Sequence, residues 1–169
     1  MMIFLCGFSG AGKTYLLKKL QQDFTDFNWF FFDLDEEIEK RKQSPIWKIV
    51  QECGIDHFRT LETEQLEKIQ GSKDLPNCLV ALGGGTLDLN LKSIKNTPDT
   101  KLVWLDTPFE KCFARISGDE CRPLASLGRN KLEKLYCQRC TSYQKADLVL
   151  SNIQIENVKK LNQLIDLLK

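Results

Sequence analysis

Residues 7–14 read Gly-Phe-Ser-Gly-Ala-Gly-Lys-Thr and match the pattern G-x-x-x-x-G-K-[ST] at every fixed position. Glycines at these places let backbone N–H groups turn inward around phosphate oxygens, and a helix that follows presents its positive end to them. Lys13 can then bridge the β- and γ-phosphates of a nucleotide, and the Thr14 hydroxyl can join the shell of a Mg²⁺ ion. A glycine-rich turn with an incidental lysine is the alternative, but a chance match is on the order of one in a hundred. The segment predicts a nucleotide-binding loop.

Two acids, Asp33 and Asp35, follow the aromatic run 29–32 with one residue between them. Open α/β folds bind ligands at the carboxyl ends of their strands, where this pair would lie. In an extended chain both side chains leave on the same face, so one can approach a metal–phosphate group while the other accepts a substrate hydroxyl. The alternative is an N-cap Asp at the start of an acidic helical turn. The spacing alone leaves both interpretations open.

The features of a GTPase switch are missing from the sequence. No Asp has a Gly three places later, and residues 130–133, Asn-Lys-Leu-Glu, have Glu where a guanine site needs Asp. A guanine site is therefore disfavoured, and the second substrate must be sought among the remaining charged residues.

The elements that must position these residues alternate between strands and helices. Short apolar strands are expected at 3–6, 29–32, 78–82, 102–105 and 148–150, and helices at 15–24, 36–42, 46–53, 58–70, 109–116, 130–146 and 155–168. Buried strands that alternate with helices indicate a parallel sheet covered on both faces. The expected fold is a three-layer α/β/α domain with a central five-stranded parallel sheet, and a single such domain spans residues 1–169.

The expected protein is a monomer of the cytoplasm. The 24 basic and 23 acidic side chains nearly balance, so nucleic acid and membranes are not expected partners, and an anion must be held by a local site. Seven scattered cysteines are typical of reduced thiols, and the C-x-x-C at 137–140 lacks the second ligand pair of a zinc site. The apolar start, residues 1–6, is too short for a membrane span and lacks a basic leader.

The order of further motifs resembles that of the shikimate kinases, a P-loop family similar to the nucleoside monophosphate kinases. After the phosphate loop, the matching segments are residues 32–41, Ile46-x-x-Ile49, Gly54, Phe58-Arg59-x-x-Glu62, Gly83-Gly84-Gly85, Arg115, Arg122-Pro123-Leu124, Arg139-x-x-x-Tyr143 and Ala146-Asp147. The resemblance covers about residues 2–150 and implies a P-loop kinase fold. It also implies substrate-binding helices at about 34–62 and a lid at about 118–129.

This resemblance implies transfer of the γ-phosphoryl group of ATP to shikimate, with Mg²⁺, on the route to chorismate and the aromatic amino acids. Asp35 would be the general base, and Asp33 would hold Mg²⁺ through water beside Thr14. Lys13 and the lid residue Arg122 would stabilise charge on the phosphoryl group. The implied ATP contacts are Gly10, Ala11, Gly12, Lys13, Thr14, Tyr15, Arg115 (against adenine) and Arg122, and the implied shikimate contacts are Asp35, Arg59, Gly83, Gly84, Gly85 and Arg139. The two arginines among the latter would grip the carboxylate.

Each role has a simpler alternative. In these alternatives, Arg59 would only pair with Glu62, and Arg139 would be a solvated helix residue. Arg115 would pair with Asp119, and residues 83–85 would form a plain turn. At the level of function, the alternatives are another small-molecule kinase, acting on gluconate or a nucleotide, and a nucleotide-binding regulator without catalysis. Departures from the family pattern, Ile55 in place of Glu and a short lid, concern the rate more than the substrate class.

Overall fold

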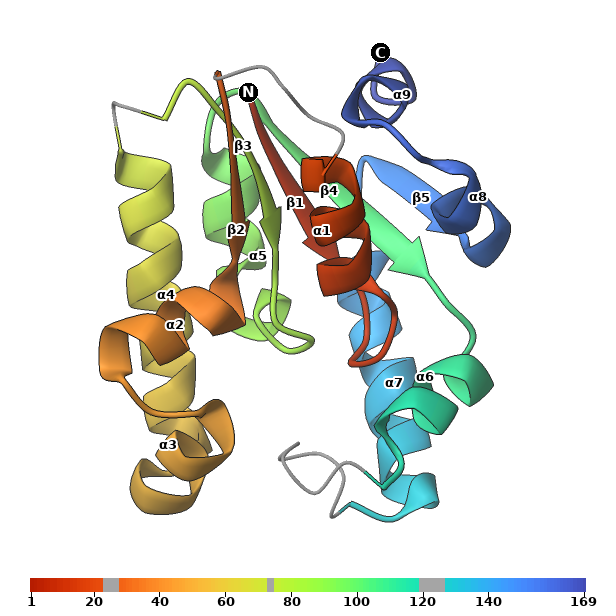
Figure 1. Ribbon diagram of the computed structural model, residues 1–169. Helices are drawn as coiled ribbons and strands as arrows, with labels where there is room; N and C mark the ends of the chain where they lie inside the picture. Colours follow the sequence, from red (N-terminus) through yellow and green to blue (C-terminus); the bar gives the residue numbers. More distant parts are fainter. Residues whose placement is uncertain (23–27, 73–74, 119–126) are drawn as a thin grey trace.

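The computed structural model describes residues 1–22, 28–72, 75–118 and 127–169 of the chain. Within these residues, five parallel strands form one sheet in the order β2-β3-β1-β4-β5, which confirms the predicted sheet. The strands are β1 (Met2–Cys6), β2 (Trp29–Asp33), β3 (Asn77–Ala81), β4 (Thr100–Asp106) and β5 (Leu148–Ser151). All five strands run downward in Figure 1, so their carboxyl ends lie at the same, lower edge of the sheet.

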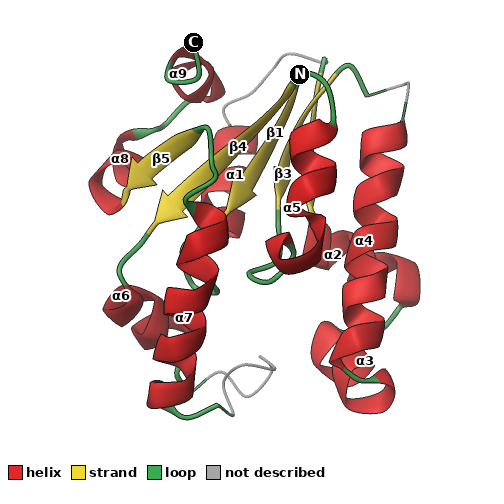
Figure 2. Cartoon of the chain, turned by 180° about the vertical axis from the view of Figure 1, so that it is seen from behind, coloured by secondary structure: helices red, strands yellow, loops and turns green. Residues whose placement is uncertain are grey.

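Helices cover both faces of the sheet. They are α1 (Lys13–Gln22), α2 (Leu34–Lys42), α3 (Ile46–Cys53), α4 (Ile55–Gly71), α5 (Leu87–Asn96), α6 (Phe109–Ile116), α7 (Arg129–Tyr143), α8 (Asn152–Asn157) and α9 (Leu161–Asp166). Helix α1 lies on one face (Figure 1), and α5 and α7 lie on the other, seen from behind in Figure 2. Helices α2, α3 and α6 gather at the carboxyl edge, where the sequence predicts the site.

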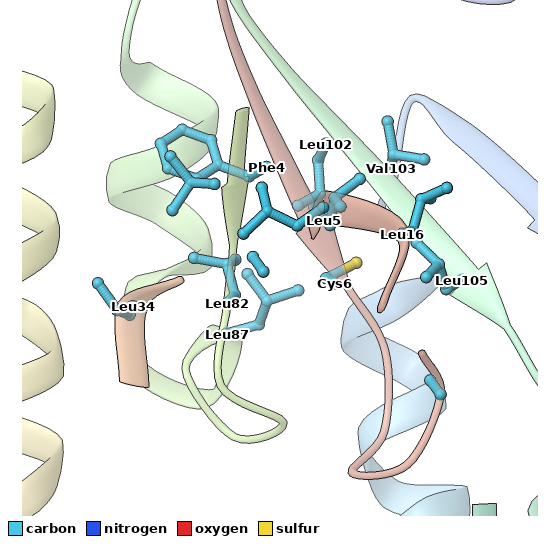
Figure 3. Close-up of a cluster of buried hydrophobic side chains, with 14 of the residues drawn as sticks. Phe4, Leu5, Cys6, Leu16, Leu34, Leu82, Leu87, Leu102, Val103 and Leu105 are labelled. Carbon is cyan, nitrogen blue, oxygen red and sulfur yellow. The ribbon is translucent and has the colours of Figure 1, made fainter. Parts of the chain in front are cut away.

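The central strand β1 is buried on both faces of the sheet. Ile3, Phe4 and Leu5 are each 0% exposed, as expected for a strand flanked by parallel neighbours and two helical layers. Figure 3 shows β1 side chains among leucines such as Leu16 of α1 and Leu87 of α5. This packed centre fixes where β1 ends and the phosphate loop begins.

The helices differ from the expectation in two places. Helix α5 was not predicted, although Leu87, Leu91 and Ile94 have helical spacing. The predicted closing helix 155–168 is two short helices, α8 and α9. Between them, the Gln163 side chain accepts the backbone N–H groups of Lys159 and Lys160. These hydrogen bonds cap the start of α9, so the chain does not continue as one helix.

Candidate active site

The phosphate loop connects the end of β1 to the start of α1, as predicted. Gly10 has φ 82°, and a Cβ there would lie 2.7 Å from a backbone carbonyl oxygen of α6, so this turn requires glycine. The Lys13 Nζ donates to the carbonyl oxygens of Gly7 at 2.8 Å and Phe8 at 3.0 Å. Burial lowers the pKa of Lys13, and the charge of nearby Asp35 opposes this shift. The lysine is therefore held over the loop before any phosphate arrives.

Thr14 and Asp33 bring two oxygens together beside the loop. The Thr14 hydroxyl donates to Asp33 Oδ2 at 2.6 Å. Asp33 Oδ1 accepts the backbone N–H groups of Asp35 at 3.1 Å and Glu36 at 3.3 Å, which makes Asp33 the N-cap of α2. The capping alternative is thus correct, but it uses one carboxylate oxygen and leaves the other at the loop. A hydroxyl and a carboxylate side by side suit the oxygen preference of Mg²⁺.

Asp35 reaches the same cleft by a different route from the one predicted. The extended arrangement of Asp33 and Asp35 is wrong, because Asp33 ends β2 and Asp35 lies in the first turn of α2. Asp35 Oδ1 is buried and has no hydrogen-bond partner among the described residues. The pKa of Asp35 is raised to about 7, mainly by burial and also by the charges of Asp33 and Glu62, while the charge of Lys13 opposes the shift. A carboxylate with this pKa is suited to accept a proton near neutral pH.

Arg59 pairs with Glu62 on the same face of α4, as the simpler alternative held, but this pairing leaves part of the guanidinium for a ligand. Glu62 is 0% exposed, and its second oxygen accepts the hydroxyl of Thr86. The ion pair uses Nη1 of Arg59, whereas Nη2 lies so close to Gly85 that a Cβ there would overlap it. Glu62 therefore holds Arg59 in place beside the glycine turn.

Arg139 comes to the same glycine from α7. Arg139 is 5% exposed, so it is not the solvated helix residue of the simpler alternative. A Cβ at Gly85 would overlap Arg139 Nη2 as well as Arg59 Nη2, so the two guanidinium groups converge over this glycine. Arg139 Nη1 is buried without a hydrogen-bond partner among the described residues. Two guanidinium groups that converge above a residue without a side chain have the charge and the donors that bind carboxylates.

The remaining glycines of the turn are also closely surrounded. A Cβ at Gly83 would lie 2.5 Å from Glu62 Oε1, and one at Gly84 would lie 3.0 Å from the backbone nitrogen of Ser9 in the phosphate loop. The Tyr143 hydroxyl donates to the Gly84 carbonyl oxygen at 2.5 Å. The turn is thus packed between the phosphate loop, α4 and α7, which explains why it consists of glycine.

The predicted adenine side of the site is partly described. Arg115 Nη1 donates to the carbonyl oxygen of Gly10 at 2.8 Å, which ties α6 to the phosphate loop. Ala11 is buried, whereas the Tyr15 side chain is 63% exposed. The predicted lid residue Arg122 and the proposed Arg115 partner Asp119 lie outside the described residues.

A cavity of about 290 Å³ joins the phosphate loop to the acids. Its lining includes Gly10, Gly12, Lys13, Thr14, Tyr15, Asp33, Asp35, Gly84 and Arg115. A larger groove of about 570 Å³ between α5 and α7 is lined mainly by leucine and lysine side chains and has neither the phosphate loop nor the acid pair. The smaller cavity therefore is the candidate active site.

Sequence reasoning missed two polar residues of this region, Thr86 and Asp88. Thr86 is fully buried against Glu62, and the Asp88 carboxylate contacts Arg139 Nε at 3.3 Å. Both lie at the start of α5, the helix that was not predicted. The spacing of Leu87, Leu91 and Ile94 was the signal that could have revealed it.

A phosphate loop that faces a buried acid and two arginines, at the carboxyl edge of a parallel sheet, defines a P-loop kinase for a small acceptor. The family model of shikimate kinase matches residues 9–169, and the chain belongs to this family. It is 36% identical to a shikimate kinase of Persephonella marina, over 88% of this chain and 87% of that one. A shikimate kinase of Staphylococcus epidermidis is 32% identical, over 99% of this chain and 92% of that one. Kinases of this family use ATP, and phosphoryl transfer from ATP generally requires a divalent cation.

Solved structures agree with the family assignment. The structure of a shikimate kinase from Acinetobacter baumannii in complex with shikimate superposes with a TM-score of 0.83 and 28% identity, covering 98% of this chain and 91% of that one. In the part of the chain that the structure describes, no helix is long and apolar enough to cross a membrane.

Proposed function

We propose that the chain transfers the γ-phosphoryl group of ATP to the 3-hydroxyl of shikimate, giving ADP and shikimate 3-phosphate. One observation carries this proposal: the guanidinium groups of Arg59 and Arg139 converge over Gly85, the neighbour of Gly84, which lines the cavity that holds Asp35 and Lys13. A planar guanidinium can bind both oxygens of a carboxylate, and a substrate with a ring carboxylate and ring hydroxyls matches this pair and this acid.

Two orphaned polar atoms support the same substrate. Arg139 Nη1 is a buried donor and Asp35 Oδ1 a buried acceptor, and neither has a hydrogen-bond partner among the described residues. Unpaired buried polar groups are unfavourable, so a ligand that pairs both gains binding energy. A carboxylate supplies an acceptor for Nη1, and a hydroxyl supplies a donor for Oδ1. Shikimate carries both groups.

In the proposed mechanism, the 3-hydroxyl oxygen attacks the γ-phosphorus while its proton passes to Asp35, and the bond to the β–γ bridging oxygen breaks, releasing ADP. Lys13, which lines the same cavity as Asp35, stabilises charge on the β- and γ-phosphates. Thr14 and Asp33 would hold Mg²⁺, Asp33 through water, and the ion would neutralise phosphate charge.

We also propose that residues 118–129 form a lid from which Arg122 stabilises charge on the transferred group, and that Arg115 lies against adenine. A single domain over residues 1–169, a monomeric state, a cytoplasmic location and a lack of nucleic-acid partners remain predictions. Analytical ultracentrifugation of the full chain checks the oligomeric state.

The proposal is tested by measuring ADP release with ATP and Mg²⁺, with and without shikimate. We expect release that depends on shikimate and is saturable, and no comparable rate with gluconate or a nucleoside monophosphate. A higher rate with either of those acceptors would assign the chain to another kinase activity. Tight ATP binding without release in the presence of any acceptor would indicate the regulator alternative.

Replacing Arg59 by lysine is expected to raise the KM for shikimate about tenfold and to leave the KM for ATP nearly unchanged. A compact ammonium cannot both pair with Glu62 and present a second nitrogen beside Gly85, as the guanidinium does. Steady-state kinetics with each substrate varied in turn separates the two constants. Equal increases in both would contradict a carboxylate role for Arg59.

Replacing Asp33 by asparagine is expected to raise the Mg²⁺ concentration needed for half-maximal rate about tenfold or more, in the range seen when partners around a metal are lost. Asparagine caps a helix about as well as aspartate, so α2 should still begin correctly and shikimate binding should persist. Titration of Mg²⁺ at saturating ATP and shikimate measures the effect. Calorimetric titration of shikimate into the variant is the control, and a lost shikimate signal there would argue that the variant damages α2.

A further inference from the structure

The Arg139 guanidinium is held by a contact with the start of α5. Its Nε donates to Asp88 Oδ2 at 3.3 Å, and its central carbon lies 5.9 Å from the centroid of the Phe8 ring. Its terminal nitrogens are placed differently, with Nη2 against Gly85 and Nη1 buried without a hydrogen-bond partner among the described residues. Asp88 therefore pairs with Nε of Arg139 and leaves the two terminal nitrogens, Nη1 and Nη2, for a ligand.

We infer that Asp88 is a positioning residue for the substrate carboxylate, which it affects by fixing the plane of the Arg139 guanidinium. The inference rests on the proposed role of Arg139 in binding shikimate. It parallels the pairing of the other arginine at Gly85, where Glu62 takes one nitrogen of Arg59. Each arginine of the pair then has its own acid, one from α4 and one from α5, and each places its Nη2 at Gly85.

An opposite effect of Asp88 is conceivable on charge alone, because a carboxylate near the pocket repels the carboxylate of the substrate. Two observations favour positioning. The Asp88 side chain is 41% exposed, so solvent screens its charge, whereas the Arg139 side chain is only 6% exposed and lies within a packed site. The contact is also directional, from the N–H of Nε to one oxygen. Holding a two-pronged donor in the correct plane is the part of binding that a point charge cannot replace.

Two substitutions separate orientation from charge. Asp88→Ala removes the acceptor and the charge, and we expect the KM for shikimate to rise about tenfold, the size of a lost hydrogen bond to a charged group. Asp88→Asn keeps an acceptor oxygen for Nε, and we expect a rise of no more than about threefold. The kcat and the KM for ATP should stay near their original values in both. Glu64→Ala is the control and should leave the KM for shikimate unchanged, because it removes a carboxylate of similar exposure that pairs with Arg41, between α4 and α2.

A double-mutant cycle decides whether Asp88 acts through Arg139. Arg139→Met alone should raise the KM for shikimate, and adding Asp88→Ala to it should have no further effect. A further rise in the double variant, an unchanged or lower KM in Asp88→Ala, or equal effects of Asp88→Ala and Asp88→Asn would each overturn the role of Asp88. If Arg139→Met leaves the KM for shikimate unchanged, the proposed clamp fails first, and the role of Asp88 fails with it. Thermal unfolding of each variant shows that it is folded.

Discussion

Alanine in place of Lys13 is expected to lower kcat for phosphoryl transfer about a hundred- to a thousandfold, the usual loss when a positioned group that stabilises transition-state charge is removed. In the structure, Nζ is held by the carbonyl oxygens of Gly7 and Phe8, inside the cavity that also contains Asp35. The ammonium therefore does not have to be ordered when ATP binds. The rate of ADP release at saturating shikimate, with ATP raised well above its KM, measures the effect.

Lys18→Ala provides the matched control for this experiment. Lys18 lies on the same helix, α1, but its side chain is 55% exposed and pairs with Glu36 at the surface. Its removal should change kcat by less than about twofold, since exposed ion pairs contribute little. If Lys13→Ala and Lys18→Ala turned over at similar rates, the assignment of the phosphate loop would be wrong.

The sheet and the phosphate loop could be predicted because their signals are local. The run Ile3-Phe4-Leu5-Cys6 is apolar throughout, as a strand buried on both faces requires, and the glycines that follow define the turn. Both predictions use only residues that are adjacent in the sequence. The end of the chain was predicted less well, because its apolar spacing fits one long helix and only the contacts of Gln163 with the backbone show where a second begins.

The arrangement of the substrate side could not be derived from spacing. Arg139 and Asp88 are separated by 51 positions in the chain, and they meet only because α5 and α7 pack on the same face of the sheet. The resemblance to the family supplied Arg59, Arg139 and the three glycines, and the spacing on α4 indicated Glu62 as the partner of Arg59, but nothing in the sequence indicated Asp88 as the partner of Arg139. Burial, which raises the pKa of Asp35, likewise depends on the assembled fold.

Replacing Asp35 by asparagine is expected to lower kcat about a hundred- to ten-thousandfold with ATP binding retained, the usual loss when a positioned base is removed. The orphaned Oδ1 is the acceptor that the 3-hydroxyl would meet. Because the pKa of Asp35 is raised to about 7, kcat/KM of the unsubstituted enzyme should fall as the pH drops below 7, and the residual activity of the variant should not follow this curve. A pH series of ADP release measures both.

Thermal unfolding of the same variant separates a lost base from a damaged fold. An acid whose pKa is raised on folding contributes stability that is complete below its unfolded value near 3.8 and is lost as the pH rises through about 7. Asparagine carries no charge beside Asp33 and Glu62, so it avoids this loss. Without nucleotide or divalent cation, Asp35→Asn should therefore unfold at a higher temperature than the unsubstituted protein at pH 8, and the difference should shrink toward pH 5. A variant that is inactive and also less stable at pH 8 would mean that Asp35 supports the fold, and one with unchanged kcat would refute Asp35 as the base.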